Sequence, residues 1–229
     1  MQITWLGHGS FRIEIADQVL LIDPWLTGNP MLAEDQHGAA TDGATHILIT
    51  HGHFDHTADV VALSKSLAAP VVGIYDLMSY FEETNGLTVI GFNMGGTVKL
   101  GNVAVSMVPA MHSTTFSSAP AAPAGREAGF ILRAEGHTIY VSGDTGIMAD
   151  MEWIANYYKP DIGILSAGGH FTMDMAGAAY AAQKYFDFKT IIPCHYRTFE
   201  LLEQSAKELI DALPSVNVIE PEVMQPLSF

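Results

Sequence analysis

Short apolar and alternating runs dominate the hydrophobic pattern of this 229-residue chain. Alternation favours a strand with one buried face, and a short continuous apolar run favours a strand buried on both faces. The run THILIT at residues 45–50 is of the second kind. The same patterns predict strands at residues 2–6, 11–16, 19–22, 71–74, 98–100, 103–109, 129–134, 138–142, 162–166 and 190–193.

Segments with helical character alternate with these strands. The segment 59–67 is closed by Ala69-Pro70, and the segment 76–84 is followed by Asn85-Gly86, which is a typical helix stop. Further helices are predicted at residues 150–158, 175–185 and 201–213. Strands that alternate with helices indicate an α/β fold.

The second half of the chain repeats the order of the first. An early pair of strands leads to Asp23, and the strands at 129–142 lead to Asp144 in the same way. The next strand of each half runs into the tripeptide GHF, at residues 52–54 and 169–171. We therefore expect two related halves. Residues 117–125 (SSAPAAPAG) are rich in small residues and proline, and this composition predicts a flexible loop.

The composition of the chain disfavours some classes of binding partner. The net charge is −15, with only ten Lys and Arg, so a nucleic acid or an anionic membrane is a poor partner. The lone Cys194 fits a reducing compartment, and the first residues do not resemble a signal peptide. We expect a cytoplasmic protein with one domain over residues 1–229, and the sequence leaves a homo-oligomer open.

The stretch ITHGHFDHTAD carries the clearest candidate chemistry. It places His51, His53, Asp55 and His56 within six residues, although the chain has only ten histidines. Imidazoles and carboxylates are metal ligands, and a packing role would not need such crowding. This stretch therefore predicts a metal site.

Three more candidate ligands each follow a predicted strand: His112, Asp144 and His195. Seven ligands exceed the number that one zinc ion takes, and they suit two metal ions about 3.5–4 Å apart with one bridging carboxylate. An aspartate can bridge two ions and a histidine cannot, so Asp144 is the expected bridge.

The pattern His-x-His-x-Asp-His, followed by a His, a Gly-Asp and a final His, resembles the metallo-β-lactamase superfamily. The segments WLGHGSF, LIDPW, NMGGTV, YVSGDTG, GGHFTMD and IIPCHYRTF extend the similarity over nearly the whole chain. They resemble the small metal-dependent hydrolases allied to L-ascorbate-6-phosphate lactonase. The resemblance implies an αββα four-layer sandwich with two pseudo-symmetric halves.

The resemblance also implies how the ligands are shared. The first metal would be held by His51, His53 and His112. The second metal would be held by Asp55, His56 and His195, with Asp144 between the two. A bridging hydroxide would be the nucleophile, with Asp55 sharing the roles of ligand and base, and Asp23 would orient a ligand imidazole. The ligand types suit zinc, and also manganese or iron.

Three residues near this pattern have open roles. His8, in a Gly-His-Gly turn, either lines the site or is a turn residue satisfied by backbone. His170, in the second GHF, is expected at the rim of the site, where it would contact the substrate or protonate a leaving group without binding metal. Arg197 would clamp an anionic substrate group or form a surface salt bridge.

The leading functional hypothesis is a metal-dependent hydrolase of a small ester, lactone or phosphodiester. A nuclease is disfavoured by the charge. The alternatives are a di-iron redox protein, although the chain has no room for a flavin domain, and a metal-binding protein without turnover. The sequence does not identify the substrate, and a screen of lactones, esters and phosphodiesters would separate turnover from binding alone.

Overall fold

The structure is a computed structural model that describes residues 1–116, 119, 122 and 124–229. Its strands form two sheets of seven. The first sheet consists of β1 (Gln2–Gly7), β2 (Ser10–Ile15), β3 (Gln18–Ile22), β4 (His46–Leu48), β5 (Val71–Ile74), β6 (Val89–Phe92) and β14 (Pro226–Ser228). The second consists of β7 (Thr97–Leu100), β8 (Val103–Pro109), β9 (Ala128–Ala134), β10 (His137–Val141), β11 (Ile162–Ser166), β12 (Thr190–Cys194) and β13 (Asn217–Val218).

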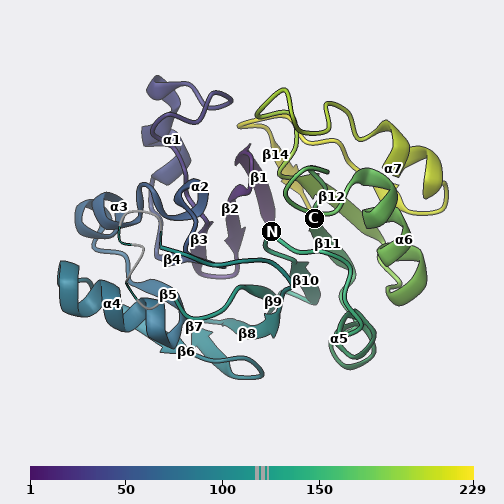
Figure 1. The fold of residues 1–229 in the computed structure, drawn as a ribbon. Coiled ribbons are helices and arrows are strands. Elements are labelled where there is room, and N and C mark those ends of the chain that lie inside the picture. The colour runs from purple at the N-terminus through teal and green to yellow at the C-terminus, as the bar shows by residue number, and fades with distance from the viewer. Residues whose placement is uncertain (117–118, 120–121, 123) are drawn as a thin grey trace.

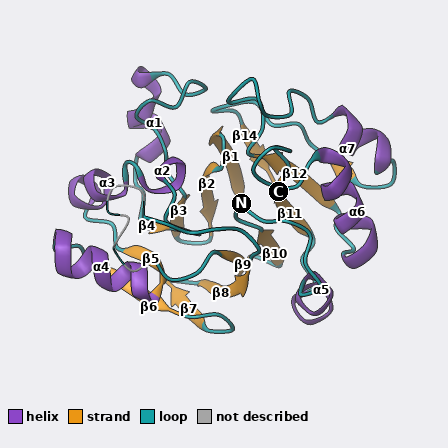
Figure 2. Cartoon of the chain, viewed as in Figure 1, coloured by secondary structure: helices purple, strands orange, loops and turns teal. Residues whose placement is uncertain are grey.

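Helices lie on the two outer sides of these sheets (Figures 1 and 2). On one side are α1 (His37–Thr41), α2 (Phe54–Thr57), α3 (Val60–Leu67) and α4 (Tyr75–Asn85), and on the other are α5 (Met151–Tyr158), α6 (Met175–Tyr185) and α7 (Lys207–Ala212). A short 3-10 helix, η1 (Glu34–Gln36), precedes α1. Buried residues from both sheets form one hydrophobic core. The predicted αββα sandwich is confirmed. Among the described residues, every helix is too short or too polar to span a lipid bilayer.

The two sheets have the same internal order, as the repeat in the sequence predicts. In the first sheet, β1, β2 and β3 are antiparallel neighbours, and β3, β4, β5 and β6 are parallel. In the second, β8, β9 and β10 are antiparallel, and β10 to β13 are parallel. The edge position that β7 takes in the second sheet is taken in the first by β14, from the C-terminal end of the chain.

Strand direction gathers the candidate site residues. Because β1 and β3 are both antiparallel to β2, they run in the same direction, and β8 and β10 are related through β9 in the same way. The carboxyl ends of such strands meet at one edge of a sheet, where α/β proteins bind ligands. The residues that follow these ends are His8 after β1, Asp23 after β3, His51 after β4, His112 after β8, Asp144 after β10, His170 after β11 and His195 after β12.

One predicted helix is wrong over its first half. The segment 201–213 was expected to be helical, but α7 covers only Lys207–Ala212. The N–H of Glu203 donates to the carbonyl of Gly168 at 2.9 Å, and its carbonyl accepts from the N–H of Arg197 at 2.8 Å. These bonds join the segment to the loops after β11 and β12, so its backbone cannot form a helical ladder there.

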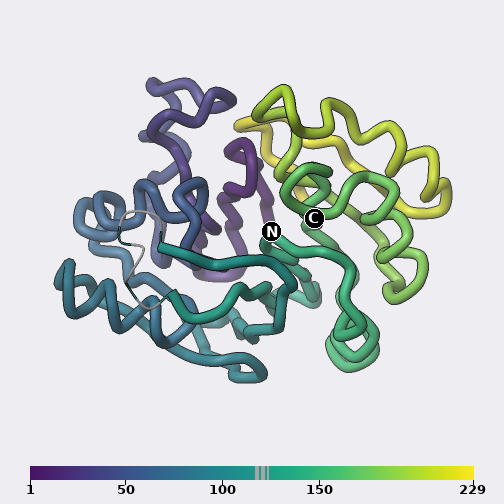
Figure 3. The backbone as a smooth tube through the Cα atoms, viewed as in Figure 1, coloured from purple at the N-terminus to yellow at the C-terminus, as the bar shows by residue number. Residues whose placement is uncertain are grey.

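Several short elements were not predicted: α1, α2, β6, β13 and β14. The loop predicted at residues 117–125 falls largely on residues 117, 118, 120, 121 and 123, which lie outside the described residues. The two ends of the chain lie side by side (Figure 3). There β14 pairs with β1, and the N–H of Phe229 donates to the carbonyl of Met1 at 3.1 Å.

Candidate metal centre

The loop after β4 delivers four candidate ligands because it turns directly into a helix. His53 is the N-cap of α2, and Asp55 and His56 lie on that helix. Gly52 allows a close approach: a Cβ at this position would lie 3.2 Å from the backbone nitrogen of Phe116. Glycine therefore lets the loop pass closely by the segment after His112.

A first group of three imidazoles comes together from this loop and from the end of β8. The ligand nitrogens of His51, His53 and His112 all lie within 4.8 Å of one another. His51 is almost fully buried, whereas His53 and His112 are half-buried. This is the set that the resemblance implied for the first metal.

A second group lies on the other side. The ligand atoms of Asp55, His56 and His195 lie within 4.8 Å of one another, together with that of His8. The imidazoles of His56 and His195 are buried, and Asp55 is half-buried. The structure thus brings together the three residues implied for the second metal and adds His8 to them.

Asp144 lies between the two groups. Its Oδ2 atom is 3.6 Å from Nε2 of His112 and 3.9 Å from Nε2 of His51 in the first group. The same atom is 3.4 Å from Nε2 of His56 and 3.0 Å from Nε2 of His195 in the second. One carboxylate oxygen therefore faces ligands of both groups, as a bridge requires.

Asp23 contacts the residues of the centre without belonging to either ligand group. Its carboxylate accepts from the N–H of Thr50 at 2.8 Å and from the Thr50 hydroxyl at 2.6 Å, and it lies 2.9 Å from Nδ1 of His56. The hydroxyl of Thr50 also lies 3.0 Å from Nδ1 of His51. Asp23 thus supports one imidazole of each group, the first through Thr50, which sequence reasoning missed. The only signal for Thr50 is its place just before the first histidine.

The buried charges of the centre perturb each other. Burial would raise the pKa of Asp144, but the imidazoles of His195 and His56 hold it well below its usual value. Burial would likewise lower the pKa of His195, but Asp144 raises it to about 9, and the carboxylates of Asp144 and Asp23 raise the pKa of His56 well above normal. Burial lowers the pKa of His51 well below normal. The buried carboxylates of Asp144 and Asp23 are therefore stabilised by nearby positive charge, which protons on the imidazoles or metal ions can supply.

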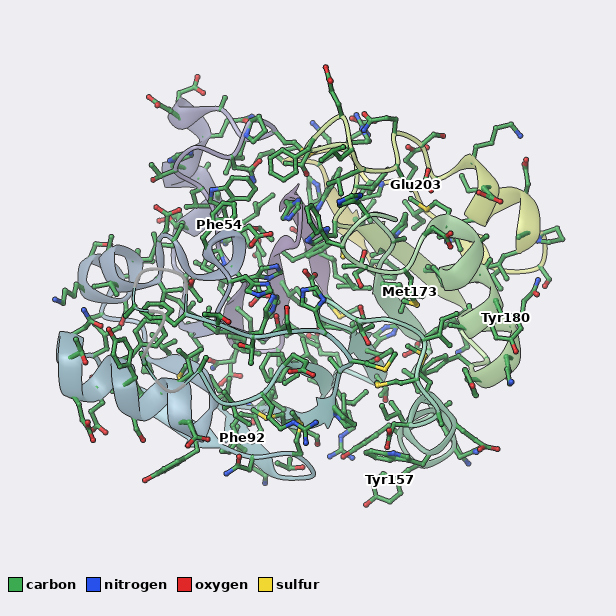
Figure 4. All side chains as sticks on the ribbon, viewed as in Figure 1. Phe54, Phe92, Tyr157, Met173, Tyr180 and Glu203 are labelled. Atoms are coloured by element: carbon green, nitrogen blue, oxygen red, sulfur yellow. The ribbon has the colours of Figure 1, made fainter. Side chains whose placement is uncertain are left out.

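The donor geometry fits a metal better than a hydrogen-bond network. In the described part of the chain, the buried ring nitrogens of His56 and His195 have no hydrogen-bond partner, although Asp144 Oδ2 lies 3.4 Å from Nε2 of His56 and 3.0 Å from Nε2 of His195. Buried nitrogens without partners are costly unless a ligand satisfies them. Imidazole and carboxylate donors suit zinc, manganese or iron. In Figure 4, nitrogen-rich side chains gather between the two halves of the molecule, near the labelled Phe54.

The remaining candidates lie in neither group of ligands among the described residues. His170 is exposed and packs edge-on against Phe171 with ring centroids 4.6 Å apart. Its role at the rim of the site stays a prediction. Nη1 of Arg197 lies 4.0 Å from the carboxylate of Glu222, which is the arrangement of a weak surface salt bridge. Cys194 is buried, burial raises the pKa of its thiol well above normal, and the cysteine is in none of the ligand groups found among the described residues.

Comparison with known proteins agrees with this site. A family model described as the β-lactamase superfamily domain matches residues 18–196. The chain is 79% identical over its full length to a UPF0173 metal-dependent hydrolase of Roseobacter denitrificans, all of which is covered, and 67% identical to one of a Ruegeria species, with 98% of each chain covered.

A solved structure is also similar. Igni18, a metallo hydrolase from the hyperthermophilic archaeon Ignicoccus hospitalis, matches with a TM-score of 0.86 and 29% identity over 100% of this chain and 98% of its own. The family match covers most of the chain and includes the residues from His51 to His195. Together with the sandwich and the clustered ligands, these similarities show that the chain belongs to the β-lactamase superfamily, among its metal-dependent hydrolases.

Proposed function

We propose that this protein binds two divalent metal ions, zinc in the first instance, and hydrolyses a small ester, lactone or phosphodiester. One observation carries the proposal: Asp144 Oδ2 lies within 3.9 Å of imidazoles from two distinct ligand groups. A single structural zinc site would need about four ligands and no shared carboxylate. The arrangement instead supports two adjacent ions with Asp144 between them.

The candidate residues would have separate roles in metal binding and proton transfer. His51, His53 and His112 would hold the first ion, and Asp55, His56 and His195 the second. When bound, two such ions lower the pKa of a water molecule between them and polarise a substrate oxygen. Asp55 would also accept a proton at its carboxylate, and His170 would protonate the leaving group from the rim.

The side chains beside the ligands favour a substrate with an apolar part. Phe54 lies between His53 and Asp55 and is 53% exposed, and Met111 precedes His112 and is equally exposed. The Phe54 ring lies 5.5 Å from that of Trp25, edge to face. Two exposed apolar side chains next to candidate ligands in the sequence support a hydrophobic group near the bond that is cleaved.

Metal removal and reconstitution test the function. Protein stripped with a chelator and then given zinc, manganese or iron is assayed on parallel panels of lactones, carboxylic esters and phosphodiesters. We expect hydrolysis on one panel that is lost without metal and restored to at least half by two equivalents. Two bound metals with no turnover on any panel would overturn the hydrolase, and absence of metal binding would overturn the centre.

A further inference from the structure

The Gly7-His8-Gly9 turn lies against the three residues proposed to hold the second metal alone, Asp55, His56 and His195. We propose that this turn is the positioning device for that position, and that His8 is a positioning residue that orients Asp55 rather than a metal ligand. The inference rests on the proposed two-metal function. It assigns a role to the WLGHGS segment, whose His8 lies within the second group of candidate ligands.

The side chain of His8 acts on Asp55. His8 is fully buried, and its Nε2 lies 2.8 Å from Oδ2 of Asp55, while its Nδ1 lies 2.8 Å from the hydroxyl of Thr198. An ionised carboxylate can only accept, so Nε2 donates to Asp55. Nδ1 of the neutral ring is then an acceptor, and the Thr198 hydroxyl donates to it. This chain fixes the ring and the Asp55 carboxylate together.

The backbone of the turn acts on the second ligand. The carbonyl of His8 accepts from the N–H of His195 at 2.9 Å and from the indole N–H of Trp5 at 2.8 Å. The rings of His8 and His195 are also packed, with centroids 3.8 Å apart. The place where His195 leaves β12 is therefore set by the turn.

Gly9 and Ser10 act on the third ligand. A Cβ at Gly9 would lie 3.0 Å from Cε1 of His56, so the turn forms a wall against that ring. The hydroxyl of Ser10 donates to the carbonyl of Asp23 at 2.7 Å, and the Asp23 carboxylate lies 2.9 Å from Nδ1 of His56. The His56 ring thus lies against Gly9 at Cε1, with its Nδ1 beside the carboxylate of Asp23.

The turn adopts a costly backbone. Gly7 has a φ of 93° and His8 a φ of 53°, so a residue with a side chain is held in the left-handed region. Such a conformation is uncommon for a residue with a side chain and persists where the surroundings determine it fully. The conformation of His8 is fixed by its hydrogen bonds to Asp55, Thr198, His195 and Trp5.

The same bonds argue against His8 as a ligand. A histidine nitrogen that donates its proton to a carboxylate has no lone pair for a metal, and Nε2 is the atom that faces Asp55. Partners that orient metal ligands typically change metal affinity by 10–100-fold when removed. The proposal thus predicts a defect confined to one of two metal equivalents.

The test uses the full chain stripped of metal and titrated with zinc by calorimetry. The variants are His8→Phe, which removes both hydrogen bonds, and His8→Gln, whose amide can donate to Asp55 and accept from Thr198. His137→Gln is the matched control, because His137 Nδ1 also lies 3.0 Å from a carboxylate, that of Asp161, at the other end of β10. A thermal melt of each metal-free variant reports folding.

We expect wild type and His137→Gln to bind two equivalents equally well. His8→Phe should weaken one equivalent about 10- to 100-fold and leave the other unchanged, and His8→Gln should lose less. In cobalt-loaded protein, His8→Gln should keep the wild-type visible spectrum, because no ligand is lost.

Two equivalents at wild-type affinity in His8→Phe would overturn the inference, as would equal weakening of both. A changed cobalt spectrum in folded His8→Gln would make His8 a ligand. If His8→Phe does not fold, the other two variants decide. Unaltered zinc affinity in His8→Gln together with lowered zinc affinity in Thr198→Val supports the inference. Wild-type zinc affinity in both variants refutes it. Wild type without metal would instead defeat the proposed function, so the two failures are distinct.

Discussion

A single oxygen of Asp144 faces nitrogens of both ligand groups, whereas the carboxylate of Asp23 contacts one ligand imidazole from outside. Asp144→Asn should therefore reduce metal content to one equivalent or less. Asp23→Asn should keep two equivalents at about 10- to 100-fold lower affinity. Elemental analysis after dialysis against buffered zinc measures both. Equal metal loss in the two variants would contradict the bridging role.

Gly168, in the loop after β11, lies very close to His195. A Cβ at this position would lie 2.1 Å from the carbonyl oxygen of His195 and 3.0 Å from its Nδ1. Gly168→Ala should therefore displace His195, lower the free energy of unfolding by about 1–3 kcal/mol as overpacking does, and weaken metal binding. Denaturant titration and zinc titration measure the two effects.

Gly38→Ala provides the control for that substitution. Gly38 lies in α1, and a Cβ there would meet no atom within 4 Å. Because alanine favours a helix over glycine by up to about 1 kcal/mol, this variant should be as stable as wild type or more so. A Gly168→Ala protein that behaves like Gly38→Ala would show that the loop after β11 can yield.

At the scale of elements, α6 begins at a well-formed cap. Asp174 is its N-cap, and its carboxylate accepts from the N–H of Gly177 at 2.6 Å. Asp174→Ala should lower the free energy of unfolding by about 1 kcal/mol, whereas Asp174→Asn, which keeps a side-chain oxygen, should lose less. Chemical denaturation of both variants checks this, and equal losses would show that the cap oxygen is not the stabilising group.

Hydrophobic pattern predicted the long, buried elements and missed the short, exposed ones. Strands such as β11 and β12 are buried at every position, so their apolar runs are unambiguous. By contrast, β13 has two residues and β14 has three, none fully buried, so neither leaves a periodic signal. The Leu201–Leu202 pair looked helical because its pattern does not reveal the backbone bonds that Glu203 makes to distant loops.

Sequence could predict those parts of the candidate site that lie just after the predicted strands. The ligands His112, Asp144 and His195 each follow a strand that the pattern identifies. The supports were less visible. The bond between His8 and Asp55 joins residues 47 positions apart, and that between His8 and Thr198 joins residues 190 apart. Only the folded chain shows such pairs, because neither partner has a local pattern.

For the whole molecule, the buried carboxylates of the candidate centre predict that stability depends on metal. Metal that binds only the folded state stabilises it by about 2.7 kcal/mol per site at a free concentration 100 times Kd. For two sites in a domain of this size, this corresponds to roughly 10–20 °C in Tm. A chelator should lower Tm by this amount, and zinc should restore it. Asp144→Asn should show a smaller shift, and an equal shift would place the metal elsewhere.

Metal should also displace protons. The pKa of His195 is raised to about 9 and that of His56 lies well above normal, so both imidazoles are protonated at pH 7 in metal-free protein. Since metal binds only neutral imidazole, zinc binding should release protons at pH 7 and tighten as the pH rises towards 9. Calorimetry in two buffers of different ionisation enthalpy counts the protons. Binding without proton release would contradict the proposed ligands.

The pairing of β14 with β1 makes the backbone nearly a closed ring. The N–H of Phe229 already bonds to the carbonyl of Met1, and the C-terminal strand completes the sheet that the N-terminal strand begins. A peptide link between the two ends would thus follow a path that the fold already takes. The chain could then be opened instead at the exposed Asp42-Gly43 turn between α1 and β4, with every strand keeping its neighbours. In such a permuted protein, the His8 turn and the His51 loop would exchange their order along the chain and keep their places around the proposed metal centre.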